Sequence, residues 1–381
     1  MIYLTLSDDY SGVYHSQVLD VCRYFRQWLG IPIRLIAIVP LRTYKNTRRR
    51  IIGIIPDALV FPMWPSRLKW QRNTWLISFL KKFLKDEVVI CRGVLATNLA
   101  MNFKKKGYIK KIIYDARGAS AAEWAEYLHQ ENEKLSREIK HLERNALLYA
   151  DFHMSISDTL VEYWRSHFSY EEKNYVTIPT TLSESFLEPL LDERNRQEVR
   201  LEYGFKPGEI VIAYSGSSAG WQSFSLLKRT VFGFMENDVR IRFLLMNDDP
   251  GPLFSLITDF PGRVSIRKCS HKEVFNLLNM VDYGLLIRED SITNRVSAPT
   301  KFAEYLAAGC GVLLKGTVGD YNQFLKDNNC GILLSDSTIP SLHPLKSEER
   351  ENNNAIAHKF FCKYSDYIEK KYRYLLSQIM N

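Results

Sequence analysis

Short apolar runs alternate along the chain with longer stretches whose apolar residues recur at helical spacing. Such alternation is typical of βαβ units, in which helices cover both faces of a parallel sheet. In the first half of the chain we expect strands over residues 2–6, 33–39, 88–91, 111–114, 152–156 and 175–178. In the second half we expect strands over residues 209–215, 240–246, 263–267, 283–287, 311–314 and 331–334. The pattern therefore predicts an α/β protein with two Rossmann-like parallel-sheet domains.

The pattern pauses near residue 180, at IPTTLSESFLEPL, and again at the polar run KSEERENNN. The pauses predict an N-terminal domain over residues 1–180, a C-terminal domain over residues 181–354 and a last helix over residues 355–381. Ligands on such sheets bind beyond the carboxyl ends of the strands, where helices begin. Functional residues are therefore expected at the strand-to-helix turns.

The segment SAPTKFAEYLAAGCG, residues 297–311, has the features of a helix start that binds an anion. Pro299 suits the first turn of a helix, and Ser297 or the alanine after it is expected at the cap. The free N–H groups of Thr300 and Lys301, together with the helix dipole, would favour a diphosphate. The ammonium group of Lys301 would add a full positive charge.

Three charged side chains around this helix start point to a nucleotide ligand. Glu304 lies one turn after Thr300, and a carboxylate there can accept hydrogen bonds from both hydroxyls of a ribose. Arg288 follows the strand over residues 283–287, and Arg295 precedes the helix. Cations beside a helix N-terminus oppose the helix dipole, so they make sense where an anion binds. The alternative is an ordinary capped helix with Glu304 exposed on its surface.

The residues DYGLLIRE and SAPTKFAEYLAAGCGVLL resemble the C-terminal nucleotide-sugar motif of GT-B glycosyltransferases of the family-4 type, in the form of a bacterial surface-polysaccharide branch. Many of these enzymes have two glutamates separated by seven residues, of which the second binds ribose. The spacing aligns Glu304 with the second glutamate, whereas Ser297 replaces the first. The resemblance implies that the turn at Thr300 and Lys301 holds the diphosphate. It also implies two domains that face a cleft, with the C-terminal helix packed back on the N-terminal domain.

Another segment resembles the same family's C-terminal domain. The residues IVIAYSGSSAGW are similar to its first strand and loop, which implies that Gly216 and Ser217 bind the nucleotide sugar together with Ser297. Many members have an arginine and a lysine shortly afterwards that neutralise the diphosphate, but the residues WQ stand here instead. Arg288, Arg295 and Lys301 are the cations expected to take over that role.

The N-terminal domain offers the catalytic and acceptor-side candidates. In IIYDARGASAAEW, Asp115 and Arg117 follow a strand, at the position of a family loop that faces the transferred sugar. An Asp–Arg pair that only shapes the turn is the alternative. Ser11 and Gly12 follow the first strand, and Arg92 follows the strand over residues 88–91, so these three are expected on the acceptor side.

Positive charge is concentrated near the N-terminus. Residues 1–120 carry 21 lysine and arginine against 7 aspartate and glutamate residues, whereas the remainder carries 30 against 36. The cations form clusters over residues 42–50, 67–85 and 104–111. The second cluster is mixed with aromatic and leucine residues, so it predicts either a helix lying on an anionic membrane or an ordinary helix with its apolar face in the core. No nucleic-acid partner is expected, because no binding module is recognisable.

The cysteines and the N-terminus bear on the location of the protein. Six cysteines without a C-x-x-C pair, mostly in apolar runs, predict buried reduced thiols. Acidic residues stand where a signal peptide would have basic ones, and no run of about 20 apolar residues is present to span a membrane. We therefore expect a cytoplasmic protein, with peripheral association on the inner face of the cell membrane through its basic domain.

The resemblance implies a glycosyltransferase, of a hexosyl or related type, that moves a sugar from a nucleoside diphosphate sugar to a hydroxyl of a glycan with retention. Resemblance and charge together suggest a lipid-linked acceptor in cell-surface polysaccharide biosynthesis. No metal or other cofactor is expected, since Asp248 and Asp249 are not a D-x-D pair and no His/Cys cluster has metal-ligand spacing. The alternatives are a sugar-nucleotide epimerase of the same fold and a non-catalytic binding subunit.

Overall fold

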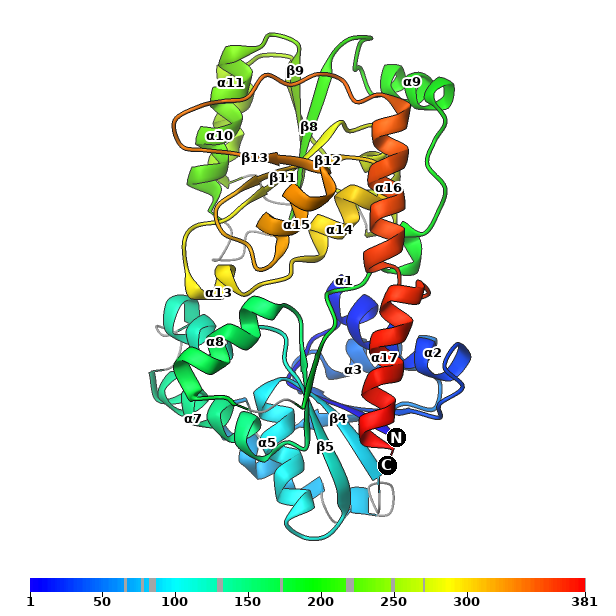
Figure 1. The fold of residues 1–381 in the computed structure, drawn as a ribbon, viewed down its shortest axis with the longest axis vertical. Helices are drawn as coiled ribbons and strands as arrows, with labels where there is room; N and C mark the ends of the chain where they lie inside the picture. The colour runs from blue at the N-terminus through cyan, green and yellow to red at the C-terminus, as the bar shows by residue number, and fades with distance from the viewer. Residues whose placement is uncertain are drawn as a thin grey trace. The chain divides into compact units, whose positions relative to one another are not determined.

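The chain forms two compact units, each built around one parallel sheet (Figure 1). The structure, a computed structural model, describes residues 1–64, 67–76, 79–81, 87–128, 133–171, 174–216, 223–247, 251–269 and 271–380. The first unit comprises Met1–Pro179 and Asp366–Asn381, and the second comprises Thr180–Ser365. The predicted α/β class with two parallel sheets is confirmed.

The sheet of the first unit has seven parallel strands in the order β3-β2-β1-β4-β5-β6-β7. Its strands are Ile2–Leu6 (β1), Arg34–Pro40 (β2), Leu59–Met63 (β3), Glu87–Arg92 (β4), Ile109–Asp115 (β5), Phe152–Ser155 (β6) and Tyr175–Thr177 (β7). Its α-helices are Gly12–Tyr14 (α1), Asp20–Gln27 (α2), Tyr44–Ile54 (α3), Gly93–Lys104 (α5), Ser120–Glu123 (α6), Glu133–Tyr149 (α7), Asp158–Phe168 (α8) and Asp366–Ile379 (α17). Two π-helices, His15–Leu19 (η1) and Trp124–Leu128 (η3), and a 3₁₀-helix, Arg67–Leu76 (η2), complete the described elements.

The sheet of the second unit has six parallel strands in the order β10-β9-β8-β11-β12-β13. Its strands are Ile210–Ser215 (β8), Ile241–Met246 (β9), Val264–Ile266 (β10), Tyr283–Ile287 (β11), Gly311–Lys315 (β12) and Gly331–Leu333 (β13). Its α-helices are Glu193–Glu202 (α9), Phe224–Asn237 (α10), Ser255–Asp259 (α11), His271–Leu278 (α12), Ile292–Arg295 (α13), Thr300–Ala307 (α14), Tyr321–Asn328 (α15) and Ser347–Phe361 (α16). Two short 3₁₀-helices are Glu184–Phe186 (η4) and Gly251–Phe254 (η5).

Every strand predicted from the apolar runs is present within two residues of its expected ends, but β3 was not predicted. Its sequence, LVFPM, holds a proline, which normally argues against a strand. Among the described strands, β3 pairs with β2 alone and forms the edge of the sheet. A proline is tolerated there, because the N–H that it lacks is not needed on the open side.

The predicted last helix over residues 355–381 is wrong, because two helices occupy the end of the chain. The polar run is not a linker but begins α16, where the Glu349 carboxylate accepts a hydrogen bond from the Lys346 backbone N–H at 2.9 Å. α16 belongs to the second unit and α17 to the first. In the first unit Tyr372 of α17 packs against Tyr24 and Phe25 of α2, with both pairs of ring centroids 5.3 Å apart. The expectation that the C-terminal helix packs on the N-terminal domain is therefore confirmed for α17.

Over residues 123–149, where the helical spacing of apolar residues would favour one long α-helix, the structure has elements of different pitch. The chain passes from α6 into the π-helical turn η3, and α7 begins at Glu133. Residues 74–84 also have helical spacing of apolar residues, and this stretch begins within the 3₁₀-helix η2, whose backbone is non-helical at Lys69. Short helices of different pitch cannot be distinguished by apolar periodicity alone, because one or two turns hold too few residues.

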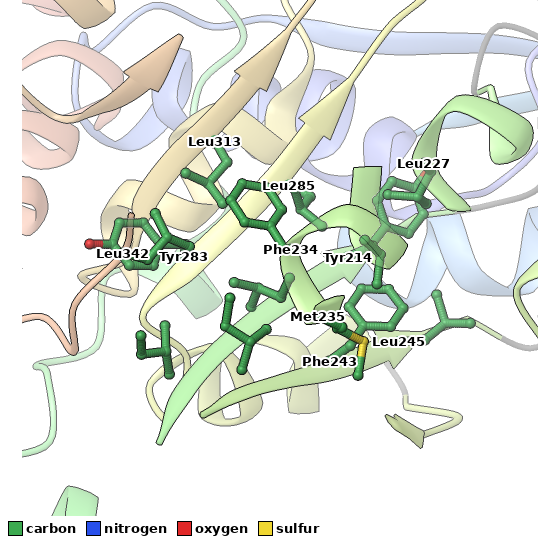
Figure 2. Close-up of a cluster of buried hydrophobic side chains, with 14 of the residues drawn as sticks. Tyr214, Leu227, Phe234, Met235, Phe243, Leu245, Tyr283, Leu285, Leu313 and Leu342 are labelled. Atoms are coloured by element: carbon green, nitrogen blue, oxygen red, sulfur yellow. The ribbon is translucent and has the colours of Figure 1, made fainter. Parts of the chain in front are cut away.

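The core of the second unit is a cluster of buried side chains from the sheet and from α10. Figure 2 shows Tyr214 (β8), Leu245 (β9), Leu285 (β11) and Leu313 (β12) with Phe234 of α10 in this cluster. Adjacent strands place Leu285 beside Leu313 in register. Because all of these residues are at most 1% exposed, the core holds the strands from which the loops of the site extend.

A buried ionic network holds the amino end of β11. Asp282 is fully buried and lies 2.7 Å from Nη2 of Arg196 and 3.1 Å from Nη1 of Arg200, both on α9. Its carboxylate also accepts hydrogen bonds from the backbone N–H groups of Val211 at 2.8 Å and Leu345 at 3.1 Å. One carboxylate therefore joins α9, two strands and the segment before α16, which fixes the strand that ends at the candidate site.

Candidate functional site

In each sheet the strand order reverses at one point, and ligands bind beyond the carboxyl ends of the strands at such a reversal. In the second unit the reversal lies between β8 and β11, and in the first it lies between β1 and β4. In the second unit Gly216 directly follows β8, and Arg288 directly follows β11. Two of the predicted nucleotide-sugar residues are therefore brought together by topology.

α14 begins without a side-chain cap. Pro299 occupies the cap position with φ −63° and ψ 132°, and no side chain in the described part of the chain caps the helix. The expectation that Ser297 or Ala298 would be the cap is wrong. The Ser297 hydroxyl instead donates to the Asn294 carbonyl oxygen at 2.9 Å, in the preceding turn. The N–H groups of the first turn, which begins at Thr300, therefore have no side-chain acceptor among the described residues and suit an anion.

Two cations lie beside this helix start. Burial and the nearby charge of Arg288 lower the pKa of Lys301 to about 8, while the carboxylate of Glu304 acts in the opposite direction. Arg288 is only 4% exposed, and its Nη1 donates to the Ile287 carbonyl oxygen at 2.9 Å. A bound diphosphate would replace the repulsion between these cations with attraction. Glu304, one turn further on α14, is half-buried on the same helix.

Tyr305 fixes the position of this helix, and it was not predicted from the sequence. Its hydroxyl donates to the Leu285 carbonyl oxygen at 3.2 Å and accepts from the Ser215 backbone N–H at 3.0 Å. The ring fits only because residue 284 is glycine, where a Cβ atom would lie 2.2 Å from the Cγ of Tyr305. A glycine inside the apolar strand DYGLLI is the sequence signal that a side chain crosses the sheet at this point.

Two glycines after β12 leave space for backbone carbonyl oxygens of the segments that lead to α14. Neither glycine was predicted from the sequence. A Cβ on Gly316 would lie 2.2 Å from the Arg288 carbonyl oxygen, and one on Gly319 would lie 2.1 Å from that of Ser297. Both residues have positive φ, 92° and 48°. The G-x-x-G spacing in KGTVGD is the signal that could have identified them.

Another of the predicted cations of the second unit, Arg295, has an acidic partner of its own. The guanidinium of Arg295 forms a bidentate pair with Asp290, with N–O distances of 2.6 and 2.5 Å, and its side chain is 55% exposed. Ser217 lies outside the described residues. Lys301 and Arg288 are therefore the two predicted cations that the structure places together.

In the first unit the two catalytic candidates form a buried pair. Nη2 of Arg117 donates to Oδ2 of Asp115 at 2.7 Å, and the Tyr3 hydroxyl also donates to this oxygen. Asp115 is only 1% exposed, so two donors already engage a carboxylate that is removed from water. This arrangement fits the alternative in which the pair shapes the turn.

The acceptor-side candidates lie at the carboxyl edge of the same sheet. Nε of Arg92 is 3.9 Å from Oδ1 of Asp8, whose pKa is raised by burial against the pull of this arginine. The Ser11 hydroxyl accepts from the Tyr14 backbone N–H at 3.1 Å and so caps α1, which begins at Gly12. The structure therefore places these residues at the reversal between β1 and β4.

In the basic cluster over residues 67–85, the described cations are exposed and most of the described apolar side chains are buried. Trp70, Leu76 and Leu80 are at most 3% exposed, whereas Phe79 is 66% exposed. Among the described helices, none is long and apolar enough to cross a membrane. Within the described ranges, no group of three or more His, Cys, Asp or Glu side chains could hold a metal ion, and residues 248–250 lie outside those ranges.

The fold is that of known glycosyltransferases. WaaG, a glycosyltransferase involved in lipopolysaccharide biosynthesis, superimposes with a TM-score of 0.66 at 15% identity over 100% of both chains. Sucrose-phosphate synthase from Thermosynechococcus elongatus has a TM-score of 0.70 at 12% identity, covering 100% of this chain and 98% of the other. HepE of Anabaena, in complex with UDP and glucose, has a TM-score of 0.68 at 12% identity, covering 99% of this chain and 100% of its own. No protein-family model and no curated protein sequence matches the chain.

Proposed function

We propose that this chain, which has the GT-B fold, transfers a sugar from a nucleoside diphosphate sugar to a hydroxyl group of a glycan. The observation that carries the proposal is the uncapped start of α14, with Lys301 and Arg288 beside it at the strand reversal of the second unit. The likeness in fold to HepE, which was crystallised with UDP and glucose, supports a nucleotide-sugar donor.

The proposed chemistry follows from the charges at the helix start. As the bond between the sugar and the diphosphate breaks, negative charge develops on the leaving diphosphate. The first-turn N–H groups and the two cations are held in place before the reaction, so they stabilise that charge without reorganising. Glu304 accepts the ribose hydroxyls, and the sugar is transferred with retention of its anomeric configuration, as the resemblance to family-4 enzymes implies.

A donor-binding experiment tests this proposal. We expect one of UDP, GDP or ADP, or its glucose conjugate, to raise the melting temperature of the protein. Glu304→Ala should weaken that binding more than tenfold, or by over about 1.4 kcal/mol, because the ribose hydroxyls lose their acceptor. Glu351→Ala, an exposed glutamate on α16, is the matched control and should leave the affinity unchanged.

The outcomes separate the alternatives. No stabilisation by any nucleotide would favour a non-catalytic subunit. A donor sugar that is epimerised in the absence of an acceptor would favour an epimerase. Unchanged affinity in Glu304→Ala would remove this residue from the site.

The proposed acceptor is a lipid-linked glycan in cell-surface polysaccharide biosynthesis, reached at an anionic membrane surface. Leu41 and Trp64 directly follow β2 and β3, whose ends pair in register, and they are 50% and 58% exposed. α3, with the sequence YKNTRRRIIGI, carries four cations and no acidic residue. Exposed apolar side chains beside a cationic helix suit an anionic bilayer.

Charge removal on α3 tests this membrane surface. We expect the triple variant Lys45→Ala, Arg48→Ala, Arg49→Ala to bind vesicles of phosphatidylcholine and phosphatidylglycerol roughly 100-fold more weakly, because each cation near the surface contributes about 1 kcal/mol. Co-sedimentation with vesicles measures the effect. The matched control, Lys105→Ala, Lys106→Ala, Lys110→Ala, removes the same charge near the amino end of β5 and should bind as the unmodified protein does. Equal losses in both variants would contradict a surface specific to α3.

A further inference from the structure

An open pocket with a volume of about 820 Å³ lies in the first unit, lined by residues of α5, α7 and η2. Pockets that hold small ligands have volumes of about 300–1,000 Å³, so this one has the size of a binding site. Its lining is rich in amide side chains, which are those of Gln71, Asn98, Asn102 and Asn145. None of the residues predicted from the sequence to bind the donor or the acceptor belongs to this lining.

The helices α5 and α7 each present one face to the pocket. On α7 the lining residues recur every three or four positions, which places them on one helix face: Glu138, Leu142, Asn145 and Tyr149. On α5, Asn98 and Asn102 are one turn apart. Nδ2 of Asn98 donates to the Leu142 carbonyl oxygen at 2.9 Å and to that of Val94 at 2.8 Å. This amide therefore joins the two helices that form the pocket.

The pocket lies away from the strand reversal of the first unit. α5 begins at Gly93, directly after β4, and so runs from the carboxyl edge of the sheet toward the amino edge. Asn102 is nine residues further along, or roughly 14 Å at a rise of about 1.5 Å per residue. The acceptor-side candidates Ser11 and Arg92 lie at the carboxyl edge. The pocket is therefore separate from the site described above.

Several polar groups of the pocket are left for a ligand. Within the described part of the chain, the side chains of Asn102 and Asn145 form no hydrogen bond, and both are half-buried. Trp70 is only 3% exposed, and its indole N–H has no acceptor among the described residues. An amide offers both donors and an acceptor, as a sugar hydroxyl also does. An acyl chain in the pocket would leave the amides without partners, which is costly, so the lining favours a saccharide.

Two of the charged side chains at the pocket are matched within the protein. Nζ of Lys104 lies 2.6 Å from both carboxylate oxygens of Asp151, and the Gln71 amide donates to the Glu138 carboxylate. The pocket therefore presents amides rather than a group of unpaired charges, and a neutral ligand suits it. Tyr149 is 64% exposed and offers a ring against which the apolar face of a sugar can pack.

We propose that this pocket binds a neutral oligosaccharide. The sugar hydroxyls form hydrogen bonds with the amides of Asn102 and Asn145 and with Oδ1 of Asn98, and one sugar ring packs against Tyr149. The site holds a glycan on the first unit and takes no part in the transfer reaction. Its binding needs no nucleotide, so it is tested independently of the proposed function.

Calorimetric titration of the whole chain with uncharged trisaccharides tests the site. The probes are maltotriose, cellotriose, mannotriose and N,N′,N″-triacetylchitotriose, and we expect at least one of them to bind. The double variant Asn102→Ala, Asn145→Ala should bind it more than tenfold more weakly, because two amides that pair with sugar hydroxyls are lost. Since neither amide is hydrogen-bonded to the described residues, the melting temperature of this variant should be unchanged.

The matched control, Asn46→Ala, Asn237→Ala, removes two exposed amides, on α3 and at the end of α10, and should bind as the unmodified protein does. Unchanged affinity in the pocket variant would place the saccharide elsewhere and overturn the proposal. Equal weakening in both double variants would also overturn it. If none of the trisaccharides binds, the proposal is wrong, and binding of decanoate in their place would identify a pocket for an acyl chain.

Discussion

Replacing Lys301 with methionine is expected to weaken the binding of UDP, or of the nucleoside diphosphate that the protein prefers, by about 100-fold, or roughly 2–3 kcal/mol. Methionine keeps most of the length and apolar surface of the side chain and removes the charge. The charge lies at the start of α14 beside Arg288, where the helix itself already favours an anion. A charge-assisted contact in a partly buried site is stronger than one in water, so its loss should dominate the affinity.

The same lysine should make nucleotide binding depend on pH. Its pKa is lowered to about 8, so the ammonium is charged below that pH and becomes neutral above it. A neutral amine attracts the diphosphate less, and the dissociation constant should therefore rise between pH 7 and pH 9. Isothermal titration calorimetry across this range measures the effect, and the rise should be absent in Lys301→Met.

Lys326→Met, on the exposed face of α15, is the matched control, with affinity and pH dependence as in the unmodified protein. A pH dependence that is the same with and without Lys301 would contradict its role at the diphosphate.

Replacing Asp282 with asparagine is expected to lower the free energy of unfolding of the second unit by about 3–5 kcal/mol, since two buried guanidinium groups lose their counter-charge. Arg196 and Arg200 are at most 2% exposed, so water cannot compensate for the missing carboxylate. The asparagine amide would also place a donor among the donors that now surround the carboxylate. The corresponding fall in melting temperature is about 10 °C for a unit of this size.

Differential scanning calorimetry of the whole chain measures this fall as a shift of one transition. Asp290→Asn is the matched control, because that carboxylate pairs with Arg295 at the surface, where solvent screens the interaction. Its melting temperature should remain as in the unmodified protein. A shift of similar size in both variants would show that burial of the Asp282 pair adds nothing to stability.

Much of the fold could be predicted because each buried parallel strand appears in the sequence as a separate apolar run. β8 and β11 are read directly from IVIAYS and YGLLI, since both faces of these strands are covered. β3 was not predicted, because a proline is acceptable only at an edge and edge position is a property of the whole sheet. The start of α16 was misplaced, since a polar run can either be a linker or begin a helix.

The helix start of the candidate nucleotide site could be predicted from the sequence. The P-T-K-x-x-E spacing in residues 299–304 places Thr300, Lys301 and Glu304 on the start of one helix, because short-range spacing alone determines helical neighbours. Arg295 was expected at the same place, but it pairs with Asp290. Which acidic group pairs with an arginine in a loop depends on the path of the backbone. No periodic pattern in the sequence predicts that path.

The sequence by itself determined the two parallel sheets and the helix start that suits an anion, since both depend on neighbours within a few residues. Only the tertiary structure decided which contacts hold the sheets and this helix start in place. Tyr305 reaches Ser215 across 90 residues, and Gly319 leaves space for the Ser297 carbonyl oxygen. It also decided that a π-turn, His15–Leu19, precedes α2, so that Nε2 of His15 lies 3.3 Å from Oδ1 of Asp20. These contacts depend on packing between distant segments, and a single sequence carries no periodicity from which such packing can be derived.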